Sequence, residues 1–358
     1  MTRVVGIDPG TVSIDVCGLV DGQLYLDLSW PTQDALANPE AFLQLLTGPG
    51  VPDLVAGPSG YGLPLIRSGT LTEDNLRLAF LAPPGEPGGI EGLRTLARQL
   101  NQSGLNVVYT PGVIHLESVP VHRKINRVDM GTADKVCAAI LGIHEECRRQ
   151  SCQPEQVSFI LLELGGAFTA GVAVDHGQVV DGIGGTSGPI GWRAPGALDG
   201  EVAYLAGSIT KAALFRGGVS SFLNRDPAQH SVALRAYVEG AAKAVRQLRG
   251  SAPSAGDILL SGRNATQAGI IEYLTSELAD IGTVRLLRGF AEVAKQGAQG
   301  AALVADGWDD STEGFYMQGE TYVVITTGAD SGMTAEVLDE QGLGFLGDEF
   351  LIVVAYTV

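Results

Sequence analysis

The sequence has few cysteines and no long apolar run, and both absences narrow the classes of protein it can belong to. None of its four cysteines lies in the paired CxxC spacing of a zinc site, so we interpret them as reduced thiols. No uninterrupted apolar segment reaches the roughly 20 residues that span a bilayer. Asp8 and Asp15 interrupt the N-terminal segment where a signal peptide would have its apolar core. These features predict a cytoplasmic protein without a membrane partner.

Basic residues are also scarce. The chain has 23 Lys and Arg against 40 Asp and Glu, which gives a net charge of −17. A general nucleic-acid binder, or a protein that binds an anionic membrane surface, needs a basic face. Neither partner is therefore expected, and an anionic small molecule would need a local basic cluster.

The first candidate site is the turn inside "VVGIDPGTVSIDV", residues 4–16. A buried strand leads to Asp8, then to Pro9, Gly10 and Thr11, after which the apolar pattern resumes. One interpretation is a turn that holds phosphate and a metal ion. The other is an ordinary hairpin turn, because Asp-Pro-Gly is a common turn tripeptide.

The same pattern returns in "VSFILLELGGAFTAGVAVDHGQVVDG", residues 157–182. Both stretches give a strand, an acidic residue, glycine, a threonine, a second strand, a turn and a third strand. Glu163 occupies the position in the second stretch that Asp8 occupies in the first. Because two turns placed alike in successive halves are less easily accidental than one, the repeat favours the phosphate interpretation.

Length and composition predict an α/β protein of two domains. The chain has 358 residues, of which 45% are hydrophobic, and its 49 glycines suit many tight strand-to-helix turns. We place one domain at residues 1–150 and the second at 151–308. The acidic, strand-like residues 309–358 are expected to form an appended β element.

Five stretches in this order resemble motifs of the acetate and sugar kinase, heat-shock chaperone and actin superfamily. "GIDPGT" and "ELGGAFTAG" resemble its two phosphate motifs, and "ILLSGRNA" its adenosine motif. "GTADKVCAAILGIH" and "GAQGAALVADG" resemble its two connecting helices. The resemblance covers residues 3 to 307. It implies two ribonuclease-H-like (actin-like ATPase) domains that close on ATP and Mg²⁺.

Within that superfamily the chain looks most like an uncharacterised family of predicted butyrate kinases. "RKINRVDMGTADKV", "LGGAFTAGVAVDHGQVVDG" and "GTSGPIGWRAPG" suggest carboxylate kinases, and "AGPSGYGLP" is similar to that uncharacterised family. Glu163 departs from the aspartate usual at the second phosphate motif. The third glycine common there is also missing.

The resemblance assigns roles to individual residues. The cofactor-binding residues it implies are Gly10, Thr11, Gly165, Gly166, Thr169, Gly262 and Arg263. Glycine lets a backbone approach phosphate without a Cβ, and threonine offers a hydroxyl and an N–H. Asp8 and Glu163 would face each other across the cleft and hold Mg²⁺, partly through water.

The chemical group that accepts the phosphoryl group determines the class of kinase. A carboxylate is already ionised at pH 7, so it needs cations rather than a general base. The run "VHRKINRVD" supplies a basic cluster for the acceptor, made up of His122, Arg123, Lys124 and Arg127. Arg193 is a second candidate clamp. Ser59 and Tyr61 would line the acceptor pocket. The leading hypothesis is thus an ATP-dependent kinase that converts a small carboxylate to an acyl phosphate.

Two other hypotheses remain open. A sugar or polyol kinase would need an aspartate as general base, and Asp129 and Asp199 are the candidates. An ATP-dependent regulator of the same fold would need no acceptor, and the replacement of the usual aspartate by Glu163 favours it. The sequence leaves the oligomeric state open, with a homodimer as one candidate assembly.

Overall fold

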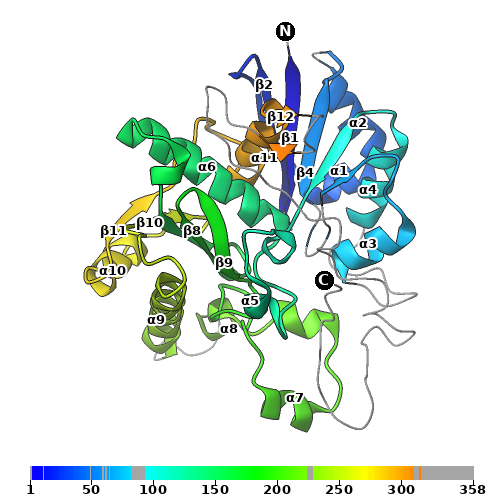
Figure 1. Ribbon diagram of the computed structural model, residues 1–358. Coiled ribbons are helices and arrows are strands. Elements are labelled where there is room, and N and C mark those ends of the chain that lie inside the picture. The colour runs from blue at the N-terminus through cyan, green and yellow to red at the C-terminus, as the bar shows by residue number, and fades with distance from the viewer. Residues whose placement is uncertain are drawn as a thin grey trace. The chain divides into compact units, whose positions relative to one another are not determined.

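The computed structural model describes residues 2–10, 12–48, 50–58, 60, 63, 65–81, 93–223, 229–309 and 314–315. The chain divides into two compact units. Unit 1 comprises Met1–Val128, Thr132–His144 and Gly289–Val358, and unit 2 comprises Asp129–Gly131 and Glu145–Arg288. The mixed α/β architecture confirms the fold class that the sequence predicts (Figure 1).

Unit 1 is built on a six-stranded sheet of order β3-β2-β1-β4-β6-β5. Its strands are β1 (Arg3–Pro9), β2 (Ser13–Val20), β3 (Gln23–Pro31), β4 (Leu54–Pro58), β5 (Ile66–Arg67) and β6 (Val107–Thr110). β1, β2 and β3 form the antiparallel meander that the alternating pattern predicts. On its other side β1 pairs with β4 in parallel, and β4 with β6.

The helices of unit 1 connect and cover these strands. They are α1 (Thr32–Ala37), α2 (Pro39–Thr47), α3 (Glu73–Phe80), α4 (Leu93–Gln102), the 3₁₀ turn η1 (Val113–His115), α5 (Val121–Lys124) and α11 (Gln296–Asp306). α2 starts as its sequence predicts, because Pro39 takes the first helical position and the Asn38 side chain accepts from the Ala41 N–H. α6 (Ala133–Gln150) begins in unit 1 and ends in unit 2.

Unit 2 repeats the sheet plan with the order β11-β10-β7-β8-β9. The strands are β7 (Phe159–Leu164), β8 (Thr169–Asp175), β9 (Gln178–Ile183), β10 (Asp257–Ser261) and β11 (Thr283–Leu286). β7, β8 and β9 form the antiparallel meander, and β7 pairs with β10 in parallel. Asp8 and Glu163 therefore hold equivalent positions, each near the end of the strand that joins an antiparallel hairpin to a parallel neighbour.

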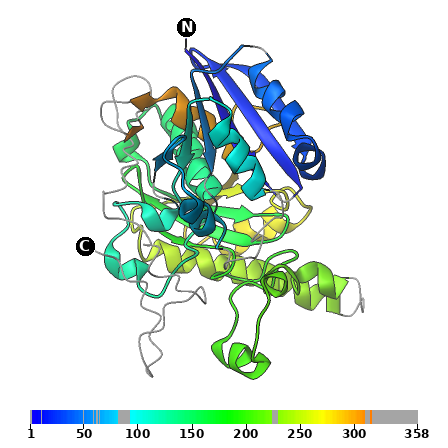
Figure 2. The same ribbon diagram turned by 90° about the vertical axis from the view of Figure 1, so that its right-hand side faces the viewer.

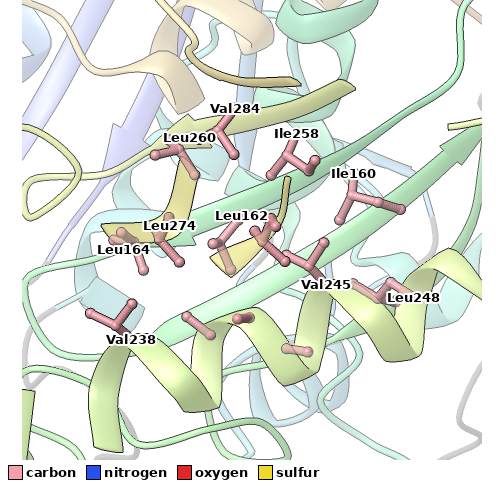
Figure 3. Close-up of a cluster of buried hydrophobic side chains, with 14 of the residues drawn as sticks. Ile160, Leu162, Leu164, Val238, Val245, Leu248, Ile258, Leu260, Leu274 and Val284 are labelled. Carbon is pink, nitrogen blue, oxygen red and sulfur yellow. The ribbon is translucent and has the colours of Figure 1, made fainter. Parts of the chain in front are cut away.

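A core of aliphatic side chains covers one face of the unit 2 sheet. Figure 3 shows side chains from β7, β10 and β11 meeting Val238, Val245 and Leu248 of α9 (His230–Arg249). The remaining helical elements of unit 2 are η2 (Pro154–Gln156), α7 (Gly200–Ala206), η3 (Lys211–Phe215), α8 (Val219–Leu223) and α10 (Ile270–Glu277). Burial of these apolar side chains provides the main driving force for folding of the unit.

Helix α11 packs closely on the sheet of unit 1, whereas the sequence pattern alone groups it with the second half of the chain. A Cβ on Gly6 of β1 would lie 2.1 Å from the Ala302 amide nitrogen. A Cβ on Gly300 would lie 1.8 Å from the Cys137 carbonyl oxygen of α6. The glycines and alanines of "GAQGAALVADG" thus allow backbone-to-backbone approach that any larger residue would prevent.

The expected β element at residues 309–358 falls almost entirely outside the described residues. Those that are described form a small ribbon of β12 (Trp308–Asp309) and β13 (Gly314–Phe315). The four cysteines are free thiols, as the sequence predicts. Among the described residues, no helix combines the length and apolar character needed to cross a bilayer.

Candidate functional site

The first candidate site is the turn between β1 and β2 of unit 1. The Gly10 N–H lies 3.1 Å from the Asp8 carbonyl oxygen and 3.0 Å from that of Ser13, and the Thr32 hydroxyl donates to the Gly10 carbonyl at 2.8 Å. A Cβ on Gly10 would stand 2.9 Å from the Ser13 carbonyl oxygen. Glycine is therefore required here by close packing. Thr11, its predicted partner, lies outside the described residues.

A lysine that the sequence analysis missed lies against this turn. The Lys295 ammonium donates to the Ser13 hydroxyl at 2.7 Å and forms a 2.5 Å ion pair with the buried Asp15 carboxylate. It would also lie 3.0 Å from a Cβ on Gly10. The Lys295 side chain is 42% exposed, so a positive charge stands beside the glycine turn and within reach of solvent.

The loop that carries this lysine is firmly held. The Asp27 carboxylate accepts hydrogen bonds from the backbone N–H groups of residues 292–294, the shortest at 2.6 Å from Ala294. The buried Gln299 side chain accepts from the N–H groups of Phe290 and Ala291. Because side chains satisfy the backbone on both flanks of the loop, Lys295 is positioned before any ligand arrives.

Asp8 is buried among charges of both signs. Burial, and after it the charge of the neighbouring Asp134 carboxylate, raises the pKa of Asp8 from 3.8 to about 7. Lys295 and Lys135 act in the opposite direction but do not cancel this shift. Burial also acts on Asp134, but the Lys135 ammonium outweighs it, and the pKa of Asp134 lies below its ordinary value. A Cβ on Gly297 would come within 2.8 Å of an Asp8 carboxylate oxygen. The neighbouring lysines therefore do not fully compensate the negative charge of ionised Asp8. A bound cation would stabilise a carboxylate in this environment.

The second candidate site is the turn between β7 and β8 of unit 2. The Gly165 N–H donates to the Phe168 carbonyl at 2.9 Å, and a Cβ on Gly165 would lie 3.2 Å from Glu163 Oε1. Glu163 is half-buried. The carboxylate therefore lies directly beside the glycines of its turn, as the repeat predicts.

The predicted adenosine motif meets this second turn. Gly262 has a left-handed φ of +86°, and a Cβ there would lie 2.6 Å from the Leu164 carbonyl oxygen. Asn264, which the sequence analysis did not single out, donates from Nδ2 to the Gly165 carbonyl at 2.5 Å. The exposed Arg263 lies alongside, its Cδ 3.8 Å from where a Gly166 Cβ would be. Unit 2 thus brings Gly165, Gly166, Gly262 and Arg263 together.

The predicted Thr169 and Arg193 occupy different environments at this turn. Thr169 is fully buried, and its hydroxyl donates to the Ile190 carbonyl at 3.2 Å. Arg193 is exposed, and its Nε donates to the Gly166 carbonyl at 3.0 Å. The structure therefore places a guanidinium on the second turn, whereas the Thr169 hydroxyl fastens the loop that follows β9.

The basic run "VHRKINRVD" is partly helical, since it contains α5, and its cations differ in environment. Lys124 is buried, its ammonium donates to the Leu116 carbonyl at 2.8 Å, and burial lowers its pKa. His122 is exposed and Arg123 is partly exposed. His122 and Arg123 thus keep access to solvent, while Lys124 is a structural residue. Ser59 and Tyr61, the other predicted acceptor residues, lie outside the described residues.

The two acids that a hydroxyl kinase would recruit as a base have structural roles in unit 2. The buried Asp129 carboxylate accepts from the Thr186 N–H at 2.8 Å and the Thr186 hydroxyl at 2.7 Å. Asp199 caps α7 by accepting from the Glu201 N–H at 2.8 Å. Both carboxylates are thus engaged by backbone groups of unit 2 itself.

A family model described as "Protein of unknown function (DUF1464)" matches residues 6–323. The chain belongs to this family. The match spans both turns, the adenosine motif and α11. No curated protein matches the sequence.

The DUF1464 chain is similar in fold to acyl kinases of known structure. A propionate kinase from Francisella tularensis subsp. tularensis SCHU S4 superposes with a TM-score of 0.59 at 14% identity, covering 84% of this chain and 98% of that one. The Porphyromonas gingivalis acetate kinase gives 0.58 at 11% identity, again covering 84% and 98%. The Entamoeba histolytica acetate kinase gives 0.56 at 10%, covering 78% and 87%. The protein therefore has the same two-domain α/β fold as these acetate and propionate kinases.

The described residues contain no group of three or more His, Cys, Asp or Glu side chains placed to hold a metal ion. Mg²⁺ at a nucleotide usually takes one or two protein carboxylates and fills its other positions with water and phosphate oxygens. Asp8 and Glu163 thus remain candidate ligands, each in its own unit.

Proposed function

We propose that this protein is an ATP-dependent phosphotransferase whose acceptor is a small carboxylate and whose product is an acyl phosphate. The observation that carries the proposal is a cation fixed against each glycine turn, Lys295 on the first and Arg193 on the second. Transfer between two anions requires the negative charge of both to be compensated. The fold shared with acetate and propionate kinases supports the same reaction class.

The residues of both turns suit a triphosphate and a divalent ion. Close packing against the Ser13 carbonyl fixes the backbone of the Gly10 turn, and turns of this kind can bind phosphate through successive backbone N–H groups. Asp8 in unit 1 and Glu163 in unit 2 are the candidate carboxylate ligands for Mg²⁺. When bound, Mg²⁺ would neutralise charge on the phosphate oxygens. Each turn is a candidate site for phosphates of ATP, and in unit 2 Gly262 and Arg263 are the candidates for contact with its adenosine.

The hydrogen bonds made by the aspartates of unit 2 favour a carboxylate over a hydroxyl as the phosphoryl acceptor. In the proposed step one carboxylate oxygen forms a bond to the γ-phosphorus while the bond from that phosphorus to the ADP oxygen breaks. No proton has to leave the acceptor, because a carboxylate is ionised at pH 7. A hydroxyl acceptor needs a general base, and Asp129 and Asp199 are both committed to hydrogen bonds with backbone N–H groups.

Arg193 and the Arg123 region supply the cations for the acceptor. An arginine can hold a carboxylate through two parallel hydrogen bonds. Arg193 already contacts the Gly166 carbonyl through Nε. His122 and Arg123 lie in α5 of unit 1, where His122 is exposed and Arg123 is partly exposed. Because of the family resemblance, butyrate is the first carboxylate to test.

The proposal is tested by ADP release with Mg·ATP and two substrate panels, one of short-chain carboxylates and one of sugars and polyols. Wild type should respond to the carboxylates. Arg123→Ala and Arg193→Ala should each lower that rate about thirtyfold or more, since losing one partner of a desolvated charged contact typically costs about 2–5 kcal/mol. Arg235→Ala, which removes an exposed cation of α9, is the matched control and should retain the rate.

The two other hypotheses predict different results in the same assay. A hydroxyl kinase would respond to the second panel only and would lose activity with Asp129→Asn or Asp199→Asn. A regulator would release ADP at the same low rate whatever acceptor is added. Either outcome would overturn the carboxylate assignment.

A further inference from the structure

An arm of unit 2, residues 198–217, projects from the rest of that unit and carries α7 near its tip. Both figures of the whole chain show α7 well away from the sheet and from α9 (Figures 1 and 2). The arm is anchored at its two ends. The Ala197 N–H donates to the Gly188 carbonyl at 2.7 Å, and the Gly218 N–H donates to the Arg193 carbonyl at 2.9 Å.

The arm exposes apolar side chains that soluble proteins usually bury. Tyr204 and Leu205 are each 80% exposed and Val202 is 53% exposed, with Leu198 and Ile209 also exposed. No residue of α7 is buried. A Cβ on Gly200 or Gly207 would have no atom within 4 Å, so the surroundings of the helix are open. Several exposed apolar side chains on one short segment favour an interaction site.

The conformation of α7 is defined although none of its own side chains is buried among the described residues. The Asp199 side chain caps α7 by accepting from the N–H groups of Glu201 and Val202. A single helix this short is unstable in water without packing against another surface. The capped helix with its bare tyrosine and leucine therefore has the properties of a preformed contact surface, and tyrosine is enriched in such surfaces.

We propose that the arm is the contact surface between two copies of this chain in a homodimer. The chain carries a net charge of −17, yet the arm has two acidic residues, Asp199 and Glu201, and two basic ones, Lys211 and Arg216. A neutral surface is where two strongly acidic copies repel each other least. In a twofold contact both copies present the same surface to each other. Such a surface must carry both signs of charge, so that each charged group can face one of opposite sign.

The size of the arm also suits this partner. It comprises about twenty residues, and a standard interface uses about 20–30 residues from each side. The arm begins and ends at the segment that carries Arg193, so the dimer contact would be continuous with the second turn. This inference concerns assembly and stands whether or not the protein phosphorylates a carboxylate.

The test is the mass of the full-length protein in solution by sedimentation equilibrium, without nucleotide, across about 1–50 μM. Wild type should weigh twice the 37.3 kDa of one chain. Leu205→Glu should be monomeric at the same concentrations, because it places a charge in each half of the contact. Val51→Glu, at a valine of unit 1 that is 70% exposed, is the control and should stay dimeric.

Three results would overturn the proposal. They are a monomeric wild type at every concentration, a Leu205→Glu variant that remains dimeric, and equal dissociation of Leu205→Glu and Val51→Glu. Thermal unfolding of the variants checks that the fold is kept. Leu205 is so exposed that its replacement should leave the melting temperature of the monomer unchanged.

Discussion

Replacing Asp8 by asparagine should abolish phosphotransfer and at the same time stabilise the ligand-free protein above neutral pH. The folded-state pKa of Asp8 is raised from 3.8 to about 7, first by burial and then by Asp134. A carboxyl group with a raised folded pKa stabilises the folded state below its unfolded pKa and loses that contribution as pH rises toward the folded pKa. Wild type should therefore lose stability between about pH 4 and pH 7 through this residue.

The magnitude follows from the same two pKa values. One pKa unit corresponds to about 1.4 kcal/mol, so the charged Asp8 destabilises the ligand-free protein by on the order of 4 kcal/mol above pH 7. Asparagine has the same shape without the charge. Since 1 kcal/mol changes Tm by about 2–4 °C in a domain of 150–250 residues, Asp8→Asn should unfold roughly 5 °C or more above wild type at pH 8. The gap should be small near pH 4.

The assay is differential scanning calorimetry of both proteins from pH 4 to pH 8, alongside ADP release. The activity of Asp8→Asn should fall about a thousandfold if Asp8 is the metal ligand that we propose. Asp134→Asn is the control of opposite sign. The pKa of Asp134 is lowered, so that variant should be less stable than wild type at pH 8. An Asp8→Asn protein less stable than wild type at pH 8 would refute the reasoning, since Lys295 and Lys135 would then outweigh burial.

Other substitutions test the remaining parts of the site. Glu163→Asp should keep or raise activity, whereas Glu163→Gln should be severely impaired; equal activity of both variants and wild type in ADP release would make Glu163 structural. Lys295→Met should weaken ATP binding about tenfold or more and AMP binding little, because a hydrogen bond to a charged group is worth about 1.5–3 kcal/mol. Lys243→Met, at an exposed cation of α9, should change neither affinity, and equal losses for ATP and AMP in calorimetry would contradict a phosphate contact by Lys295. Removal of residues 309–358 should lower solubility before it affects ATP affinity, because its apolar segments must be buried somewhere; a soluble truncated protein that no longer binds ATP would contradict this.

The parts of the fold with a local signal could be predicted from the sequence. Alternating apolar residues and short turns predict both antiparallel meanders, and the spacing of Asp8 and Glu163 predicts that the two turns are equivalent. Gly165 and Gly262 were predicted as a pair of contacts to one nucleotide, and the structure brings them together in unit 2. The residues that define the meanders and the two turns are adjacent in the chain or belong to the repeat, whereas the pairing of Gly165 with Gly262 followed from the family resemblance.

The contacts missed by the sequence analysis join segments far apart in the chain. Lys295 reaches Asp15 across 280 positions, and nothing in "EVAKQG" distinguishes it from a surface lysine. Helix α11 has a stripe of small residues that predicts close packing but not the sheet against which it packs. Asp129 was predicted as a spare acid, yet its partner Thr186 lies 57 positions away, so only the tertiary structure reveals its hydrogen bonds.

The central claim is tested most directly by trapping the product. Wild-type protein is incubated with Mg·ATP, butyrate or another short-chain carboxylate, and hydroxylamine, which converts an acyl phosphate to a hydroxamate. The account predicts hydroxamate in amounts equal to the ADP released, and none with Asp8→Asn. ADP release without hydroxamate for any carboxylate, or phosphorylation of sugars and polyols alone, would contradict it.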